Sequence, residues 1–355
     1  MLITVRMEKE SVLKPAQNEQ KYNILLKSIG NIWNKGRTEA ATAINTIMVN
    51  TYWNIGREIV EFEQKGELRA KYGEALLHQL SRDLKQKYGK GFSITNLQYM
   101  RLLYMNYQKH QTLSGELNKF QTLSGKLSWS HYIELLGITE KMERNFYEKQ
   151  CLLENWSVRE LKRQVDSGLF YRIALNRDKK GIINLCKKGN IISNARDLVK
   201  DPYVLEFLDL PEHYSEKELE NRLVSNLAKL MLEFGRGFSF IARQFRISLD
   251  GEHYYVDLVF YHKILKCFVL IDLKIGRVTA SDVGQMNMYL NYFKNEENSI
   301  DDTAPIGIIL SAHKGRANVR YALGGISNNL FVSRYKTYLP DRKELENRLR
   351  EILCA

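Results

Sequence analysis

Apolar residues recur every three to four positions through the first third of the chain, which is the period of an amphipathic helix. Residues 21–65 are predicted to be helical and to form two successive helices, each with its own group of apolar positions. Further helices are predicted over 74–88 and 95–107, and the glycine-rich segment GKGFS at 89–93 separates them. The first part of the chain is therefore expected to be α-helical.

The last two of these helices have the size and the tight turn of a helix-turn-helix. Lys90, Asn96 and Arg101 carry side chains that can reach phosphates or base edges in a major groove. An ordinary helical hairpin with a solvated face explains the same pattern. Without a family argument, the residues favour this second interpretation, so both stay open.

In the second half of the chain the apolar period changes to two, which predicts strands. A long helix over 215–234 precedes them, with Ser215 placed as its cap. Asp-Gly at 250–251 is a strong hairpin signal between the first two strands. The predicted strands and helices, in chain order, are strands 238–248, 253–261 and 266–273, helix 280–293, strand 305–312, a short basic helix, and strand 331–339. This order predicts a mixed α/β sheet.

Periodicity fades and lysines gather between residues 172 and 196. We therefore predict a helical domain over 17–172, a basic linker over 173–196 and an α/β domain over 197–345. QTLSGEL at 111–117 recurs as QTLSGKL at 121–127, a spacing too short for a solenoid repeat, and is interpreted as a duplication within a polar loop.

Composition fits two soluble domains, since the chain has 355 residues, of which 44% are hydrophobic and 26% charged. The net charge of +12 favours a polyanionic partner, nucleic acid before a membrane surface. No apolar run approaches the length of a membrane span, and the N-terminus lacks the pattern of a signal peptide. Four scattered cysteines without metal-site spacing fit a reducing compartment, so a cytoplasmic location is expected.

The segment CFVLIDLKIG (267–276) places two charges, Asp272 and Lys274, in an otherwise apolar strand. If the preceding hairpin turns between residues 264 and 265, Asp257 lies opposite Asp272, on the face that also carries Lys274. Like charges directly across a ladder repel. A divalent cation such as Mg²⁺, which prefers oxygen ligands, resolves this conflict, and the carbonyl of Leu273 is a candidate third ligand. A strand-end salt bridge to Lys274 is the alternative.

Such a metal site suits phosphodiester hydrolysis. The ion would lower the pKa of a water molecule and stabilise charge on the phosphate, while Lys274 would orient or help to deprotonate the attacking water. Arg243, on the first strand, is a candidate phosphate contact or a solvated strand position.

As a set, the motifs of the chain resemble the bacterial YhcG-like proteins, a group of PD-(D/E)XK nucleases with a winged-helix-type DNA-binding domain in front. The resemblance extends from about residue 20 to 340. The residues that carry it are YWNIGREI (52–59), GKGFSITNLQYMR (89–101), LSWSHYIELL (127–136), WSVRELKRQ (156–164), GFSFIARQ (237–244), YYVDLVFYH (254–262), VLIDLKIG (269–276) and GQMNMYL (284–290).

The resemblance implies a restriction-endonuclease-like α/β domain and assigns its site by position. Asp257 matches the first metal-binding acid, and Asp272 and Lys274 match the (D/E)XK element. Aspartate stands at 272, where the family pattern usually shows glutamate. Gln285 matches a glutamine that points into the site in several branches of the superfamily.

The acid on the leading helix is matched by Glu220, with Glu218 as a rival that our own interpretation makes a helix cap. The resemblance thus gives Asp257, Asp272 and Glu220 as metal ligands. The expected function is a Mg²⁺-dependent (or Mn²⁺-dependent) DNA endonuclease whose N-terminal domain binds DNA. The DNA structure that it cuts stays open, and double-strand cutting would favour a homodimer. A DNA-binding or scaffolding protein with an inactive nuclease fold is the alternative, and RNA is a weaker option as substrate.

Overall fold

A computed structural model describes residues 14–65, 70–107, 126–313 and 329–354. The chain divides into two compact units, residues 1–137 and 138–355, which are described separately. The duplicated QTLSG segment and the short basic helix expected after residue 312 fall largely or wholly outside the described residues.

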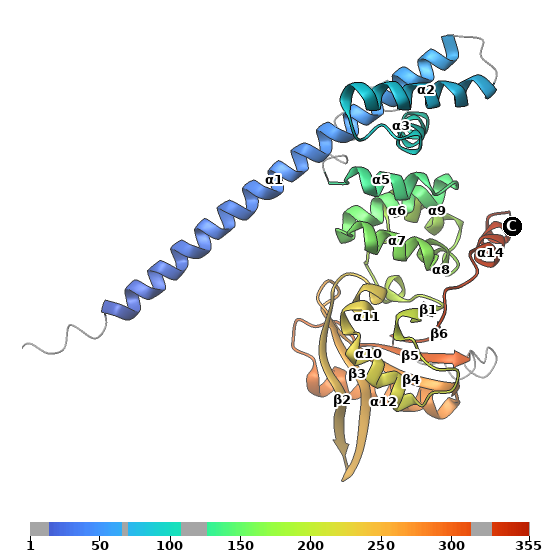
Figure 1. The fold of residues 1–355 in the computed structure, drawn as a ribbon. Helices are drawn as coiled ribbons and strands as arrows, with labels where there is room; N and C mark the ends of the chain where they lie inside the picture. The colour runs from blue at the N-terminus through green and yellow to red at the C-terminus, as the bar shows by residue number, and fades with distance from the viewer. Residues whose placement is uncertain (1–13, 66–69, 108–125, 314–328, 355) are drawn as a thin grey trace, which may run out of the picture. The chain divides into compact units, whose positions relative to one another are not determined.

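The N-terminal unit consists of helices in its described part: α1 (Lys14–Lys65), α2 (Ala70–Tyr88), α3 (Ile94–Asn106) and α5 (Trp129–Leu136) (Figure 1). The α-helical prediction is confirmed. The two apolar groups within 21–65 belong to one continuous helix, because the single Gly36 between them does not break it. No strand that would form a wing occurs in residues 14–65, 70–107 and 126–137.

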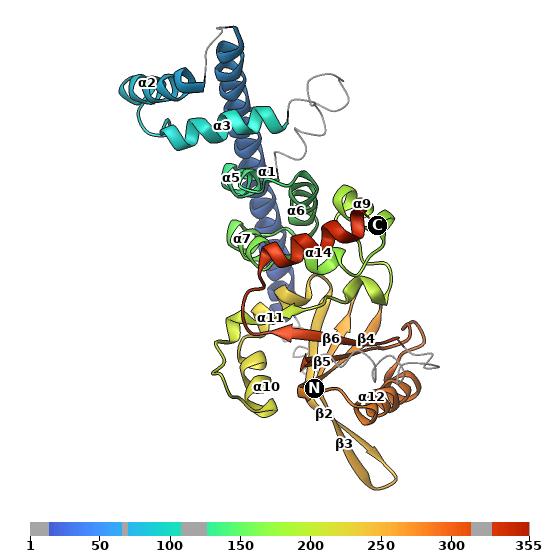
Figure 2. The ribbon, with the colours of Figure 1, turned by 90° about the vertical axis from the view of Figure 1, so that its right-hand side faces the viewer.

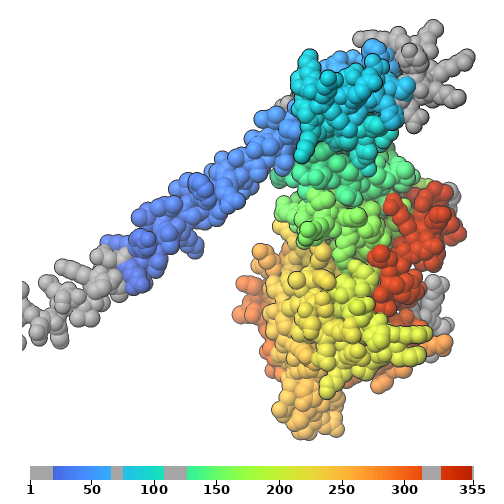
Figure 3. Space-filling model, in the orientation of Figure 1, coloured from blue at the N-terminus to red at the C-terminus, as the bar shows by residue number. Residues whose placement is uncertain are grey.

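Only the C-terminal part of α1 contributes to the core of this unit. Val49 and Trp53 are buried there, and a Cβ atom on Gly56 would lie 2.0 Å from the carbonyl oxygen of Met100, so α1 and α3 approach backbone to backbone. The earlier apolar side chains, such as Ile29 and Trp33, are exposed. The first part of α1 extends away from α2 and α3 (Figure 3). Periodicity thus predicts the helix without showing which of its turns are covered.

The C-terminal unit begins with four short helices: α6 (Lys141–Glu154), α7 (Val158–Asp166), α8 (Leu169–Ala174) and α9 (Lys179–Lys188). Helix α9 lies inside the predicted linker 173–196, yet its Ile182 and Leu185 are buried and it packs on α6. The spatial division therefore falls at Gly137, earlier than the linker that we predicted. Lysines on the solvent side of α9 made this short amphipathic helix resemble a connector.

A mixed sheet forms the centre of this unit, as the sequence predicted. It has six strands in the order β1-β6-β5-β4-β3-β2, and the short β1 was not predicted. Strands β2, β3 and β4 are antiparallel neighbours, whereas β4, β5, β6 and β1 pair in parallel. The strands are β1 (Tyr203–Val204), β2 (Phe238–Leu249), β3 (Glu252–His262), β4 (Cys267–Arg277), β5 (Ile306–His313) and β6 (Asn329–Lys336). The hairpin β2–β3 extends beyond the rest of the unit (Figure 1).

Helices cover both faces of the sheet (Figure 2). Helices α10 (Glu216–Ser225) and α11 (Leu227–Phe234) pack on one face, and α12 (Ala280–Tyr292) packs on the other. The single helix predicted over 215–234 divides at Asn226, whose side-chain amide donates to the carbonyl of Arg222. The remaining described elements are η2 (Ala195–Leu198), η3 (Glu206–Leu208), the π-turn η4 (Phe293–Glu297) and α14 (Arg342–Cys354).

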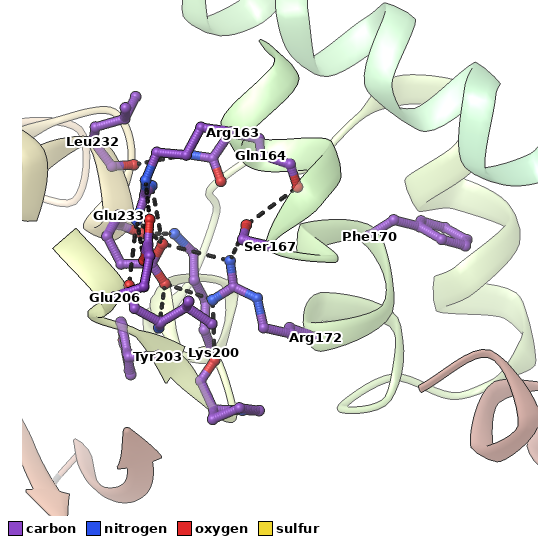
Figure 4. Close-up of polar contacts among 12 residues, drawn as sticks. Arg163, Gln164, Ser167, Phe170, Arg172, Lys200, Tyr203, Glu206, Leu232 and Glu233 are labelled. Carbon is purple, nitrogen blue, oxygen red and sulfur yellow. Dashed lines mark hydrogen bonds and ion pairs between the residues drawn. The ribbon is translucent and has the colours of Figure 1, made fainter. Parts of the chain in front are cut away.

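A buried ionic network joins α7 and α8 to the sheet domain (Figure 4). The carboxylate of Glu233, on α11, has no exposed surface and pairs with the equally buried Arg172 and with Arg163. It also accepts the backbone N–H of Val204 at 3.0 Å, and the ammonium of Lys200 donates to the Glu233 carbonyl. The first helices of the unit are thereby attached to β1 and α11.

Candidate active site

Strands β3 and β4 pair in the register that the sequence predicted. Leu258 faces Ile271 and His262 faces Cys267, so continuing the ladder by one residue places Asp257 opposite Asp272. Asp272 is only 5% exposed, and its Oδ2 lies 3.0 Å from Nζ of Lys274. The three groups that the DxK element was expected to bring together do converge.

Hydrogen bonds fix both carboxylate oxygens of Asp257. The backbone N–H of Leu273, between the two charged residues of β4, donates to Asp257 Oδ2 at 2.8 Å. The side-chain amide of Gln244, on β2, donates to Asp257 Oδ1 at 2.9 Å. The carboxylate is therefore held in one orientation by the protein alone.

Electrostatics at the pair favour a bound cation. Burial, followed by the charge of Asp257, raises the pKa of Asp272 to about 7, even though Lys274 opposes this. Burial also raises the pKa of Asp257. Two adjacent carboxylates that are costly to ionise are a donor set suited to a hard divalent ion, so these residues fit the metal that the family implies.

Lys274 interacts with both the strand and α12. Its Nζ also lies 3.7 Å from Oδ1 of Asp282, in the first turn of α12. Burial alone would lower the pKa of Lys274, but the charges of Asp272 and Asp282 outweigh burial and raise it. The salt bridge considered as an alternative is therefore present, but it does not remove the repulsion between the two aspartates.

Of the two acids considered on α10, Glu220 faces the site. It is 6% exposed, accepts from Gln244 Nε2 at 2.8 Å and is also bound by Arg243. The backbone N–H of Glu218 donates to Ser215 Oγ, and its half-exposed side chain pairs with Arg222. Among the described residues, no group of three or more acidic, histidine or cysteine side chains lies close enough to hold a metal; Glu220 is joined to Asp257 through Gln244.

Gln285, on α12, is hydrogen-bonded to Tyr289 on the same helix. Its Nε2 donates to the hydroxyl of Tyr289 at 2.5 Å, and that hydroxyl donates to the carbonyl of Tyr255. Burial and then the charge of Asp272 raise the pKa of Tyr289 to about 12, so the phenol lies in the field of the acidic pair. Tyr289 was not predicted as a site residue, although its i+4 spacing from Gln285 places both on one helix face.

The predicted DNA-contacting side chains differ in their surroundings. Asn96 donates to the carbonyl of Gly91 and accepts the indole N–H of Trp129, and Arg101 pairs with Glu63 at 2.8 Å. These contacts are internal to the N-terminal unit. Arg243 is bound to Glu220 and to Asn221 Oδ1, the latter at 2.6 Å. Lys90 is exposed and lines an open hollow of about 620 Å³ beside Lys85 and Ser93.

A mixed sheet with an acidic pair and a lysine on adjacent antiparallel strands is the arrangement of a PD-(D/E)XK nuclease domain. Residues 196–350 match the family model described as the YhcG PDDEXK nuclease domain, and residues 28–172 match the DUF1016 N-terminal domain. The chain is 41% identical over 350 residues to a protein of Escherichia coli (strain K12) named "Putative nuclease YhcG", covering 92% of this chain and 93% of that protein. The chain belongs to the YhcG family.

Two solved structures show partial likeness. A repair endonuclease from Pyrococcus abyssi is 21% identical, with 36% of this chain and 50% of that chain covered and a TM-score of 0.27. An EndoMS complex with double-stranded DNA is 19% identical, with 38% and 48% covered and a TM-score of 0.28. Separately, no helix in the described part of the chain is both long and apolar enough to cross a membrane.

Proposed function

We propose that this protein is a metal-dependent DNA endonuclease that hydrolyses phosphodiester bonds. The observation that carries the proposal is the pairing of half-buried Asp257 with buried Asp272, with Lys274 Nζ 3.0 Å from Asp272. The match to the YhcG PDDEXK nuclease domain supports the assignment of this protein to the nucleases. DNA as the substrate and the dependence on metal are the parts that experiments must test.

Asp257 and Asp272 would hold Mg²⁺ or Mn²⁺, with the Leu273 carbonyl as a candidate further ligand and Glu220 linked to them through Gln244. A bound divalent ion supplies a Lewis acid and an activated water for phosphodiester hydrolysis. With its raised pKa, Lys274 is a cation at neutral pH, so it can neutralise charge on the phosphate. Gln285 orients the hydroxyl of Tyr289 beside this pair.

Magnesium is expected to raise the melting temperature, and the rise should grow between about pH 6 and about pH 8. Below its pKa of about 7, Asp272 keeps a proton that the metal must displace; above it, the free carboxylate binds directly. A metal at a hundredfold excess over its Kd stabilises the fold by about 2.7 kcal/mol. Thermal denaturation across a magnesium and pH grid measures the effect.

Asp250→Asn is a matched control, because this exposed carboxylate lies at the tip of the β2–β3 hairpin. It should keep the full magnesium response, whereas Asp272→Asn should lose it. If the wild-type protein shows no shift with Mg²⁺ or Mn²⁺ but binds DNA normally, the protein is instead a DNA-binding or scaffolding member with an inactive nuclease fold.

The N-terminal unit is proposed to bind DNA, supported by the net charge of +12 and by exposed Lys90 beside the α2–α3 turn. DNA affinity should fall steeply with salt, because each phosphate contact releases counterions. Lys90→Ala should reduce the slope of log affinity against log salt by about one. Fluorescence anisotropy with a labelled duplex measures it, and Lys149→Ala, which removes a lysine paired with Glu148, is the control. An unchanged slope in Lys90→Ala would remove this lysine from the interface.

Two further features belong to the same proposal. Cutting both strands of a duplex in one encounter favours two active sites, so the working form is proposed to be a homodimer. A cytoplasmic location is proposed because the described cysteines Cys151, Cys186 and Cys267 are free and buried.

A further inference from the structure

Gln244 has an unusual backbone for a residue inside a strand. Its φ is +48°, a left-handed conformation that is strained for a residue other than glycine. The neighbouring pairs Arg243–Leu258 and Phe245–Val256 keep a common register that places Gln244 opposite Asp257. The strand thus continues on both sides of Gln244, and the strain is confined to the one residue that faces the acidic pair.

The side chain of Gln244 connects two acids from different elements. Its Nε2 donates to Glu220 Oε2 at 2.8 Å and to Asp257 Oδ1 at 2.9 Å. The amide nitrogen has two hydrogens, so both are used. Because both partners are carboxylates, the donor end of the amide must face them and the carbonyl end must turn away.

This bridge completes the support of Asp257. The other oxygen of Asp257 accepts the N–H of Leu273, in the middle of the DxK element. A neutral donor suits this place, because a cationic side chain would compete with a metal for the carboxylate and an anionic one would add repulsion. Arg243 donates to the other carboxylate oxygen of Glu220, Oε1.

We propose that Gln244 is a positioning residue for the metal, whose amide orients Asp257 and couples it to Glu220 on α10. This inference rests on the proposed metal-dependent nuclease. Hydrogen-bond partners of metal ligands typically contribute 10- to 100-fold to metal affinity. We therefore expect Gln244→Ala to raise the Mg²⁺ concentration at the midpoint of the thermal shift by about that factor.

The Gln244→Asn variant distinguishes the effect of the two hydrogen bonds to Glu220 and Asp257 from the effect of the strained backbone at residue 244. Asparagine adopts left-handed φ more readily than glutamine, but its side chain is one methylene shorter and cannot span both acids. The metal-free Gln244→Asn protein should melt no lower than wild type, while its Mg²⁺ midpoint rises as in Gln244→Ala. Cleavage at saturating Mg²⁺ should recover most of the wild-type kcat, because the ligands remain.

The experiment is a magnesium titration of the melting temperature for the full chain, repeated as cleavage rate against magnesium. Arg246→Ala, on the same strand and hydrogen-bonded to His253, is the control and should keep the wild-type midpoint. Wild-type midpoints in both Gln244 variants, with or without a lower melting temperature, would overturn the positioning role and leave the proposed function intact. A wild-type protein without any metal response would overturn both.

Discussion

Replacing Lys274 by alanine is expected to lower the cleavage rate by at least about 10²–10³-fold, the usual effect of removing one charged group that stabilises a transition state. The ammonium lies 3.0 Å from Asp272 and has a raised pKa, so it carries its charge at neutral pH. DNA affinity should stay unchanged, because we propose that DNA binding resides in the N-terminal unit. Cleavage of plasmid and branched DNA, beside anisotropy on the same DNA, measures both.

Asp257→Asn should lower cleavage at least as far as Lys274→Ala. The amide oxygen can still accept the N–H of Leu273 and the repulsion with Asp272 disappears, while the amide nitrogen replaces the oxygen that accepted from Gln244. Lys263→Ala, an exposed lysine in the β3–β4 turn, is the matched control for the lysine variant and should cut at the wild-type rate. Wild-type cleavage by Lys274→Ala and Asp257→Asn, with Mg²⁺ or Mn²⁺, would falsify the nuclease mechanism.

The largest expected effect on stability is that of Glu233→Gln, a loss of about 3–5 kcal/mol in the free energy of unfolding. Arg172 is fully buried, and the variant leaves its charge without a counterion. Burial would raise the pKa of Glu233, but Arg172 and Lys200 outweigh it and lower the pKa below the usual 4.5. The stabilisation is therefore complete above that pH and is lost as pH falls through the lowered pKa.

Calorimetric melting of the full chain measures this loss. Glu218→Gln is the control, since its half-exposed ion pair with Arg222 should change the free energy by less than about 1 kcal/mol. Adding Arg172→Met to Glu233→Gln should recover part of the loss, because it removes the unpaired charge. A Glu233→Gln protein as stable as the control would show that the network contributes no net stability.

Sequence patterns predicted the parts of this fold that depend on local periodicity. Strand alternation and the turn between residues 264 and 265 were enough to place Asp257 opposite Asp272, since a ladder has one register once its turn is fixed. The break at Asn226 and the continuity of α1 were not predicted, because each depends on whether one residue bends a helix in its tertiary setting.

The hardest feature to predict was which polar side chains are bound by other residues of the same fold. Asn96 and Arg101 have the chemistry of DNA contacts, but Trp129 and Glu63 bind them within the helical unit. The bridging role of Gln244 depends on a single φ angle that no pattern encodes. From the sequence, Glu233 has the pattern of a surface residue on an amphipathic helix. In the structure it is fully buried.

The pairing of Glu233 with Arg172 and Arg163 links two segments of this chain that match different family models. The two arginines lie in the segment that matches the DUF1016 N-terminal domain, and the glutamate lies in the segment that matches the nuclease domain. A recombination event between these segments could combine the buried arginines with a nuclease segment that lacks the glutamate. The product would then have a buried charge without its counterion, unless both parental genes encode all three residues. Selection should therefore transmit the two segments together and allow the arginines and the glutamate to change only in concert.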